Sequence, residues 1–375
     1  ERCLQCDPAP CIEGCPVEID IPKFIEEIKG EKFQEAIDTI KEDNNLPAVC
    51  GRVCPQEEQC QDTCTLGKNF EPVSIGRLER FAADWERENG EVDNSVRKRR
   101  DGKIAIVGSG PSGLTAASDL RQFGYDVNVY EQFHQAGGVL VYGIPEFRLP
   151  NEIVDKEVEN LREMGVNIET NKVVGRLFTV DDLLEGNRVD RHDAVFLGTG
   201  AGLPYFLDLP GENLNGIYSA NEFLTRVNLM KAFKFPEYDT PINVGDRVAT
   251  IGGGNVAIDS ARTALRLGAE SSMIIYRRSE DEMPARDEEI HHAKEEGIEF
   301  KLLRNPKRFK GSDGEVEKVE CVEMELGEPD ESGRPRPIPI EGSEFDIPVE
   351  NVIMAIGNTP HPLVTRTTER LETEE

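Results

Sequence analysis

The chain lacks any hydrophobic run that approaches the ~20 consecutive apolar residues of a membrane-spanning helix, so no membrane span is expected. Basic residues are also scarce, because 43 Lys and Arg stand against 72 Asp and Glu, giving a formal net charge of −29. Such a field repels phosphate backbones and anionic bilayers. Neither nucleic acid nor a membrane surface is therefore an expected partner.

Cysteine is nearly absent after residue 64, since eight of the nine cysteines precede that point and Cys321 is the other one. This clustering does not suit a general disulfide framework. Cys321 lies in a strand-like stretch and is expected to be a small packed side chain. The chain begins Glu1-Arg2-Cys3 and lacks the basic and apolar regions of a secretion signal. We expect a cytoplasmic protein, and either its start has been trimmed or it is a piece of a longer protein.

The eight early cysteines form two sets. The first reads Cys3-x2-Cys6-x4-Cys11-x3-Cys15-Pro16, and the second reads Cys50-x3-Cys54-Pro55 followed by Cys60-x3-Cys64. Short spacings let one segment wrap several corners of a cubane, and a Pro directly after a Cys resembles the bacterial ferredoxin run. Zinc is the alternative, but zinc sites lack this Cys-Pro pattern and no His lies near. The pattern predicts two 4Fe–4S clusters, with Cys50 still among the candidate ligands.

The rest of the N-terminal region has a helical pattern. Apolar residues recur at three- and four-residue steps over 21–40, and another helix is predicted over 75–85. The region to about residue 95 is therefore expected to be a small helical module held together by its clusters. The basic run 97–100 is interpreted as a solvated linker rather than a nucleic-acid contact.

A first dinucleotide-binding motif begins after the linker. An apolar strand over 103–107 runs into Gly108-Ser109-Gly110-Pro111-Ser112-Gly113, followed by an Ala-rich helix and a second strand that ends at Glu131. Glycines at these positions let the backbone approach a pyrophosphate at a helix N-terminus, and the acidic residue can bind a ribose hydroxyl. This context makes a chance glycine turn a poor explanation.

The same pattern recurs at a strand over 247–251, Gly252-Gly253-Gly254-Asn255-Val256 and a second helix. The next strand, 272–276, ends in Arg277-Arg278, where an acidic residue would bind a 2′-hydroxyl. Guanidinium groups suit a 2′-phosphate, which favours NADPH over NADH; a solvated pair at a strand end is the alternative. Two such folds imply two nucleotides, and hydride transfer between a nicotinamide and a flavin explains both.

Several long motifs together resemble the glutamate synthase small (beta) subunit family. They are the cysteine module, Gly143-Ile144-Pro145-Glu146-Phe147-Arg148-Leu149-Pro150, the segment 251–259, and Tyr276-Arg277-Arg278-Ser279 leading to Met283-Pro284-Ala285-Arg286. The large subunit of the NADH-dependent ferredoxin:NADP oxidoreductase and the N-terminal half of dihydropyrimidine dehydrogenase are similar as well. The resemblance covers essentially the whole chain.

The resemblance implies an α/β protein in which a helical iron–sulfur module precedes two Rossmann-like domains, the second inserted in the first. The expected boundaries are 1–96 for the iron–sulfur domain, 103–215 for the first part of the FAD domain, 216–358 for the NADPH domain, and 359–375 for the start of the return to the FAD domain. Relatives continue to a Gly-Asp pair that binds FAD. We therefore expect this chain to be truncated at its C-terminus.

The resemblance also implies ligands. One cluster would take Cys3, Cys6, Cys11 and Cys64, and the other Cys15, Cys54, Cys60 and Glu79, which leaves Cys50 as a bystander. The residues expected to hold FAD are Gly108, Gly110, Pro111, Ser112, Gly113, Glu131, Gly138, Gly143, Arg148, Gly198, Thr199 and Gly200. Those expected to hold NADPH are Gly252, Gly254, Asn255, Val256, Arg277 and Arg278.

The function expected from these features is NADPH oxidation, with a hydride passed to FAD and single electrons passed through the clusters to a partner. Hydride transfer needs orientation more than an acid or base, so no catalytic proton-transfer residue is nominated. The partner would be the glutamate synthase large subunit in an oligomer. The alternatives are the flavin-bifurcating ferredoxin:NADP oxidoreductase, with a ferredoxin-linked flavoprotein as partner, and a cluster-bearing regulatory subunit without turnover.

Overall fold

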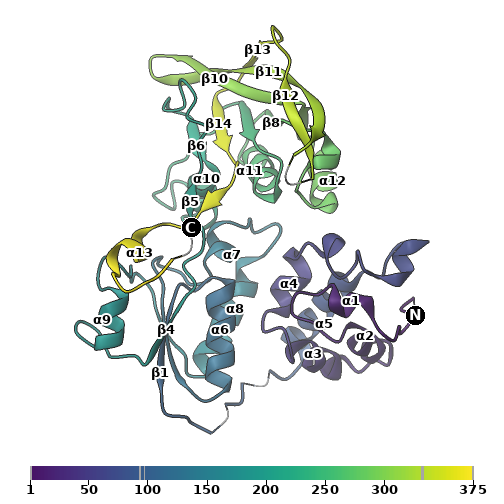
Figure 1. The fold of residues 1–375 in the computed structure, drawn as a ribbon, viewed down its shortest axis with the longest axis vertical. Coiled ribbons are helices and arrows are strands. Elements are labelled where there is room, and N and C mark those ends of the chain that lie inside the picture. The colour runs from purple at the N-terminus through teal and green to yellow at the C-terminus, as the bar shows by residue number, and fades with distance from the viewer. Residues whose placement is uncertain (1, 93, 97, 331–332, 374–375) are drawn as a thin grey trace. The chain divides into compact units, whose positions relative to one another are not determined.

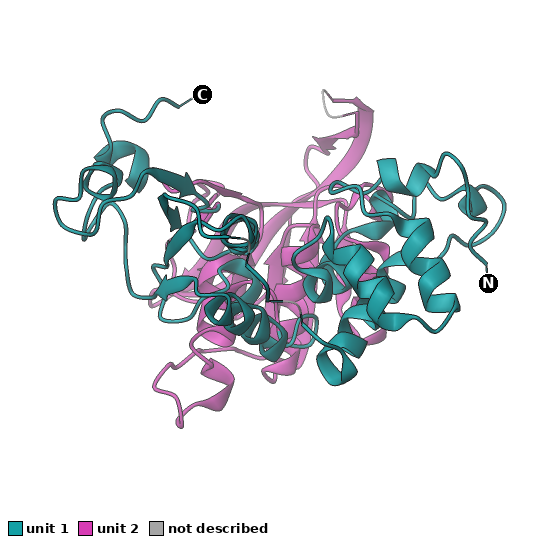
Figure 2. Ribbon diagram, turned by 90° about the horizontal axis from the view of Figure 1, so that it is seen from below, with its two compact units in different colours: residues 1–141, 146–200, 362–375 teal, residues 142–145, 201–361 magenta. Residues whose placement is uncertain are grey.

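The structure is a computed structural model that describes residues 2–92, 94–96, 98–330 and 333–373 (Figure 1). It divides into two compact units. The first comprises residues 1–141, 146–200 and 362–375, and the second comprises residues 142–145 and 201–361 (Figure 2). No helix among the described residues is long and apolar enough to cross a membrane.

The N-terminal part of the first unit is helical, as the apolar periodicity predicted. Its elements are α1 (Pro10–Glu13), α2 (Ile21–Lys29), α3 (Phe33–Lys41), α4 (Pro47–Val53), the 3₁₀ turns η1 (Gln56–Glu58) and η2 (Thr65–Lys68), and α5 (Ile75–Asn89). Helix α2 begins where the Asp20 carboxylate accepts a hydrogen bond from the Lys23 N–H at 3.2 Å. Phe24, Ile37 and Ala82 are buried in the core of this module.

The remainder of the first unit is a parallel sheet with the strand order β3-β2-β1-β4. Its strands are β1 (Lys103–Val107), β2 (Asp126–Tyr130), β3 (Asn167–Glu169) and β4 (Ala194–Leu197). Its helices are α6 (Pro111–Gln122), α8 (Asn151–Glu163), α9 (Val180–Glu185) and α13 (Leu363–Thr367), while α7 (Val139–Tyr142) ends where the second unit first appears. This is the strand–helix–strand arrangement that the first glycine motif predicted.

The second unit contains a parallel sheet with the order β6-β14-β7-β8-β9. These strands are β6 (Ile217–Ser219), β14 (Asn351–Met354), β7 (Arg247–Ile251), β8 (Ser271–Tyr276) and β9 (Glu299–Leu302). Its helices are α10 (Ala220–Asn228), α11 (Asn255–Arg266) and α12 (Asp287–Glu295), with 3₁₀ turns η3 (Ala232–Lys234) and η4 (Glu280–Glu282). Ile258 of α11 and Ile290 of α12 pack with Ile274 of β8.

An antiparallel sheet packs on the parallel sheet of the second unit. It consists of β10 (Arg304–Ser312), β11 (Glu315–Pro329), β12 (Pro335–Pro339) and β13 (Phe345–Pro348). Val319 and the fully buried Cys321 of β11 share a core with Ile275 of β8, so Cys321 is a packed side chain as expected. None of the nine cysteines forms a disulfide.

The chain enters and leaves the second unit through two adjacent segments. Strand β5 (Leu203–Pro204) pairs antiparallel with β15 (Asn358–Thr359). The second unit is thus inserted in the sequence of the first, which resumes at residue 362. The division falls at residues 201 and 361, near the predicted boundaries at 216 and 358, which stay predictions.

Candidate functional site

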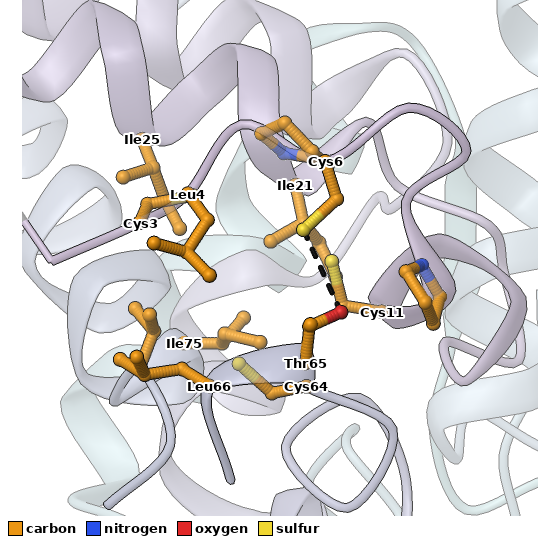
Figure 3. Close-up of a pocket in the computed structure, with 13 residues that line it drawn as sticks. Cys3, Leu4, Cys6, Cys11, Ile21, Ile25, Cys64, Thr65, Leu66 and Ile75 are labelled. Carbon is orange, nitrogen blue, oxygen red and sulfur yellow. Dashed lines mark hydrogen bonds between the residues drawn. The ribbon is translucent and has the colours of Figure 1, made fainter. Parts of the chain in front are cut away.

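Four cysteines from distant parts of the sequence line one pocket in the helical module. Cys3, Cys6 and Cys11 come from the N-terminal segment and α1, and Cys64 comes from the turn that precedes η2. Figure 3 shows the sulfurs of Cys6, Cys11 and Cys64 pointing toward a common space. The rest of the lining is mostly apolar, and Thr65 accepts a hydrogen bond from the Cys6 thiol at 3.5 Å. The apolar lining residues include Leu4, Ile21, Ile25, Leu66, Val73 and Ile75. Burial, together with the nearby Cys64, raises the pKa of the Cys11 thiol to about 11.

A second group of candidate ligands forms around Glu79 of α5. Burial is the main cause that raises the pKa of Cys60 to about 12, followed by the neighbouring Cys15, Glu79 and Cys54. Burial likewise raises the pKa of Glu79 to about 8, with Cys54 as the next cause. These effects indicate that Cys15, Cys54 and Glu79 lie near Cys60, and that Cys50 lies near Cys54 and Glu79. The ligand set that the family resemblance implies stays a prediction.

The close approach of α4 to α5 is what brings Glu79 to the cysteines. A Cβ on Gly51 would lie 2.5 Å from the backbone nitrogen of Arg80, so only glycine fits between the helices there. The Arg52 guanidinium adds an ion pair with Asp84 at 2.7 Å. Glu79 is only 6% exposed.

The donor sets fit iron–sulfur clusters better than zinc. Among the described residues, the pocket is lined by four cysteines and by no histidine. A 4Fe–4S cubane is held mainly by cysteine thiolates, one on each iron, so this donor set suits it. Cys50 lies beside the second group, where a hydrogen bond with Cys54 and burial raise the pKa of its thiol far above the usual range.

The first glycine loop is built for close backbone approach. Gly108 has φ +100°, and a Cβ there would lie 2.3 Å from the Gly198 carbonyl oxygen. A Cβ on Gly113 would lie 2.0 Å from the Gly108 carbonyl oxygen. The start of α6 can therefore approach the end of β1 this closely only because residue 113 has no side chain. Gly110 faces open space and begins α6 without a side-chain cap. The free N–H groups of this helix start are suited to a pyrophosphate.

Glu131 at the end of β2 is part of a hydrogen-bond network that the sequence reading missed. Its Oε2 accepts from the Ser109 backbone at 3.0 Å and from the Ser109 hydroxyl at 2.5 Å, and its Oε1 accepts from the Phe133 N–H at 2.8 Å. The Ser109 hydroxyl also accepts from the Gly137 N–H at 3.0 Å. Ser109 therefore links the glycine loop, the acidic residue and the turn at residues 137–138.

The other residues expected at the flavin site lie on several segments of the chain. A Cβ on Gly138, whose φ is +55°, would lie 2.6 Å from the Cα of Gly110, so the two glycines are in contact. Thr199 and Gly200 are exposed after the end of β4. Pro111 and Ser112 form the first turn of α6. Gly143 belongs to the second unit and Arg148 to the first.

The second glycine loop repeats the geometry of the first. Gly252 has φ +144°, and a Cβ there would lie 2.2 Å from the Ala355 carbonyl oxygen. Gly254 begins α11 without a side-chain cap. The Asn255 side chain accepts a hydrogen bond from the Arg286 N–H at 3.1 Å, which ties the segment 283–286 to this loop. Val256 in the first turn of α11 is exposed.

The two arginines that follow β8 occupy different environments. Arg277 is exposed, whereas Arg278 is only 3% exposed. The Arg278 guanidinium donates to the Asp330 carboxylate at 2.6 Å and to the Pro335 carbonyl at 2.8 Å. Arg278 thus anchors the β11–β12 hairpin, a role that its place in the sequence did not indicate. Both remain predicted 2′-phosphate ligands, but Arg277 is the one that the fold leaves accessible.

Comparison with known proteins follows this division of the chain. Residues 1–91 match the family described as dihydropyrimidine dehydrogenase domain II with a 4Fe–4S cluster, and residues 102–375 match the pyridine nucleotide-disulphide oxidoreductases. A solved structure of FprA from Mycobacterium tuberculosis in complex with NADPH superposes with a TM-score of 0.59 at 23% identity, covering 69% of this chain and 71% of FprA. That likeness shows the fold alone.

Two relatives extend over nearly the whole chain. The NADP(+)-dependent formate dehydrogenase subunit beta of Moorella thermoacetica is 38% identical over 93% of this chain, which spans about half (51%) of that relative's length. The glutamate synthase (NADPH) small chain of Halomonas elongata is 38% identical over 100% of this chain and 78% of its own length. Since this match extends from the cysteine module through both glycine loops, the chain belongs to the glutamate synthase (NADPH) small chain family.

Proposed function

We propose that this chain is the NADPH-oxidising, electron-delivering subunit of a glutamate synthase. Bound FAD would accept electrons as a hydride pair and the 4Fe–4S clusters would carry them singly, so that a two-electron donor can serve a partner that takes one electron at a time. The observation that carries this proposal is the order of sites along one chain. A cysteine module precedes two glycine loops, and only the second of these is followed by arginines.

The residues would act mainly by binding and orientation. The uncapped starts of α6 and α11 would each receive a pyrophosphate, and Glu131 would hold a ribose hydroxyl at the first of them. Arg277 would select the 2′-phosphate at the second. Cys3, Cys6, Cys11 and Cys64 would hold one cluster and Cys15, Cys54, Cys60 and Glu79 the other. No proton-transfer side chain is assigned to the hydride step.

The test is an anaerobic titration of the iron-loaded, FAD-supplied protein with NADPH and, separately, with NADH. Absorbance reports the flavin, and electron paramagnetic resonance reports the clusters. We expect NADPH to bleach the flavin and to produce a cluster signal, with NADH less effective. Bleaching that prefers NADH would refute the NADPH assignment. Absence of bleaching with either nucleotide would favour a cluster-bearing regulatory subunit.

The partner needs a separate experiment, because the formate dehydrogenase subunit is as similar in sequence as the synthase small chain. The protein reduced by NADPH would be mixed with a glutamate synthase large subunit, glutamine and 2-oxoglutarate, and glutamate would be measured. A matched reaction would contain ferredoxin, NAD⁺ as the second electron acceptor and a ferredoxin-linked flavoprotein in place of the large subunit. Glutamate formation supports the synthase role. Ferredoxin reduction without glutamate formation would favour the bifurcating oxidoreductase.

A further inference from the structure

A buried asparagine connects the two candidates for the eighth cluster ligand. Asn44 follows α3, is 6% exposed, and its side-chain amide donates to Glu79 Oε1 at 2.8 Å. The side-chain oxygen Oδ1 of Asn44 accepts from the Leu46 N–H at 2.9 Å and from the Cys50 thiol at 3.6 Å. One side chain thus donates to Glu79 and accepts from Cys50.

We propose that Asn44 is a positioning residue that selects Glu79 instead of Cys50 as the fourth ligand of the second cluster. This inference rests on the cluster sets of the proposed function. The amide N–H holds one carboxylate oxygen, which orients the other oxygen for iron. The side-chain amide oxygen accepts the hydrogen bond of the Cys50 sulfur, so the same amide also engages the competing ligand.

The geometry supports this selection in two further ways. The Leu46 N–H fixes the orientation of the amide, because it must face a carbonyl oxygen, so the NH₂ group is the end that reaches Glu79. The buried Gln56 side chain donates to the Cys50 carbonyl oxygen at 2.9 Å and so helps to fix the backbone that carries the thiol. Groups that hold a ligand in this way alter metal affinity and cluster potential when they are removed.

The experiment compares Asn44→Asp, Asn44→Ser and Cys50→Ala with the unaltered protein. Aspartate keeps an acceptor for the Leu46 N–H and loses the donor to Glu79, which it also repels. Serine keeps a hydroxyl acceptor on a shorter side chain, which cannot reach Glu79. Asn44→Ser provides the test if the aspartate variant does not fold. Each protein is reconstituted with iron and sulfide, analysed for iron, and titrated with dithionite under electron paramagnetic resonance.

We expect Cys50→Ala to keep about eight irons per chain, as two 4Fe–4S clusters require, with both potentials unchanged. Asn44→Asp and Asn44→Ser should lower the potential of one cluster by at least about 59 mV, a tenfold change in its one-electron equilibrium. The potential of the other cluster should stay unchanged, which would show that the helical module of the variant is still folded. In the double variant Asn44→Asp with Cys50→Ala, no thiol can replace Glu79, and iron should fall toward about four per chain.

Loss of iron from Cys50→Ala alone would overturn the proposal, because Cys50 would then be a ligand. Unchanged potentials in both Asn44 variants would also overturn it. Dithionite reduces the clusters without a nucleotide, so these results do not depend on NADPH oxidation. An unaltered protein with normal clusters that NADPH does not reduce would contradict the proposed function and leave the role of Asn44 open to the same test.

Discussion

The different environments of Arg277 and Arg278 lead to a sharp prediction about nucleotide choice. Replacement Arg277→Ala removes an exposed guanidinium directly after β8 and leaves the buried ion pair of Arg278 with Asp330 intact. We expect this variant to lose affinity for NADP⁺ but not for NAD⁺, because only NADP⁺ carries the 2′-phosphate.

The size of the effect follows from the type of contact. A hydrogen bond to a charged group contributes about 1.5–3 kcal/mol, and each 1.4 kcal/mol changes a dissociation constant tenfold. Arg277→Ala should therefore weaken NADP⁺ binding by about 10- to 150-fold. The Arg278 guanidinium is already neutralised by Asp330, so Arg278→Met should cause no comparable selective loss. It should instead lower the melting temperature, since it leaves the Asp330 carboxylate without this partner.

The assay is isothermal titration calorimetry with NADP⁺ and NAD⁺, repeated with 2′,5′-ADP and 5′-AMP. These fragments isolate the phosphate from the nicotinamide. Arg247→Ala is a matched control, because Arg247 starts β7 at the opposite end of the strand from Gly252 and pairs with Glu350 at 2.7 Å. Its affinity for all four compounds should match that of the unaltered protein.

Two results would refute the reasoning. Equal weakening of NADP⁺ and NAD⁺ by Arg277→Ala would mean that the arginine does not recognise the 2′-phosphate. Selective loss of NADP⁺ binding in Arg278→Met, with Arg277→Ala unaffected, would mean that the buried arginine exchanges Asp330 for the phosphate.

Three further predictions concern the glycine loops and the pH dependence of stability. Gly252→Ala should abolish NADP⁺ binding but keep the flavin absorbance, because its Cβ would lie 2.2 Å from the Ala355 carbonyl oxygen; normal calorimetric binding would contradict this. Glu131→Gln should weaken FAD retention in gel filtration by roughly tenfold, because the charged acceptor of the Ser109 N–H is lost; full retention would exclude the ribose role. Burial raises the pKa of Glu157 to about 7, above its unfolded value near 4.5. The stability that this raised pKa contributes is complete below pH 4.5 and is lost as the pH rises through 7. The unfolding free energy of the unaltered protein should therefore fall by about 1–3 kcal/mol between pH 5 and 8, as measured by urea denaturation. In Glu157→Gln this fall should be absent.

Much of the fold could be predicted from local patterns. The three- and four-residue apolar steps predicted the helices over 21–40 and 75–85, and the structure has α2, α3 and α5 there. Both glycine motifs lie between a parallel strand and a helix, as their spacing required. These features depend on residues close together in the chain, where backbone geometry and turn chemistry decide the outcome.

The contacts of the candidate site residues could not be predicted from local patterns. Nothing near Arg278 indicates that it pairs with Asp330, because the two residues meet only when β11 and β12 fold against the end of β8. Nothing near Glu131 indicates that the Ser109 hydroxyl bonds it, since that contact requires β1 and β2 to be neighbours. The cysteine spacing likewise left Cys50 among the candidate ligands and gave no sign that Glu79 is buried near them.

The sequence by itself determined the types of site that this protein contains, because cysteine spacing, glycine loops and the arginine pair are local requirements of their ligands. The tertiary structure alone decided which side chains are accessible and which are held. Gly51 allows α4 to approach α5 closely. This approach buries Glu79 near Cys54 and within hydrogen-bond distance of Asn44. Burial and hydrogen bonding depend on residues that are distant in the chain, so they are set by packing and not by local sequence.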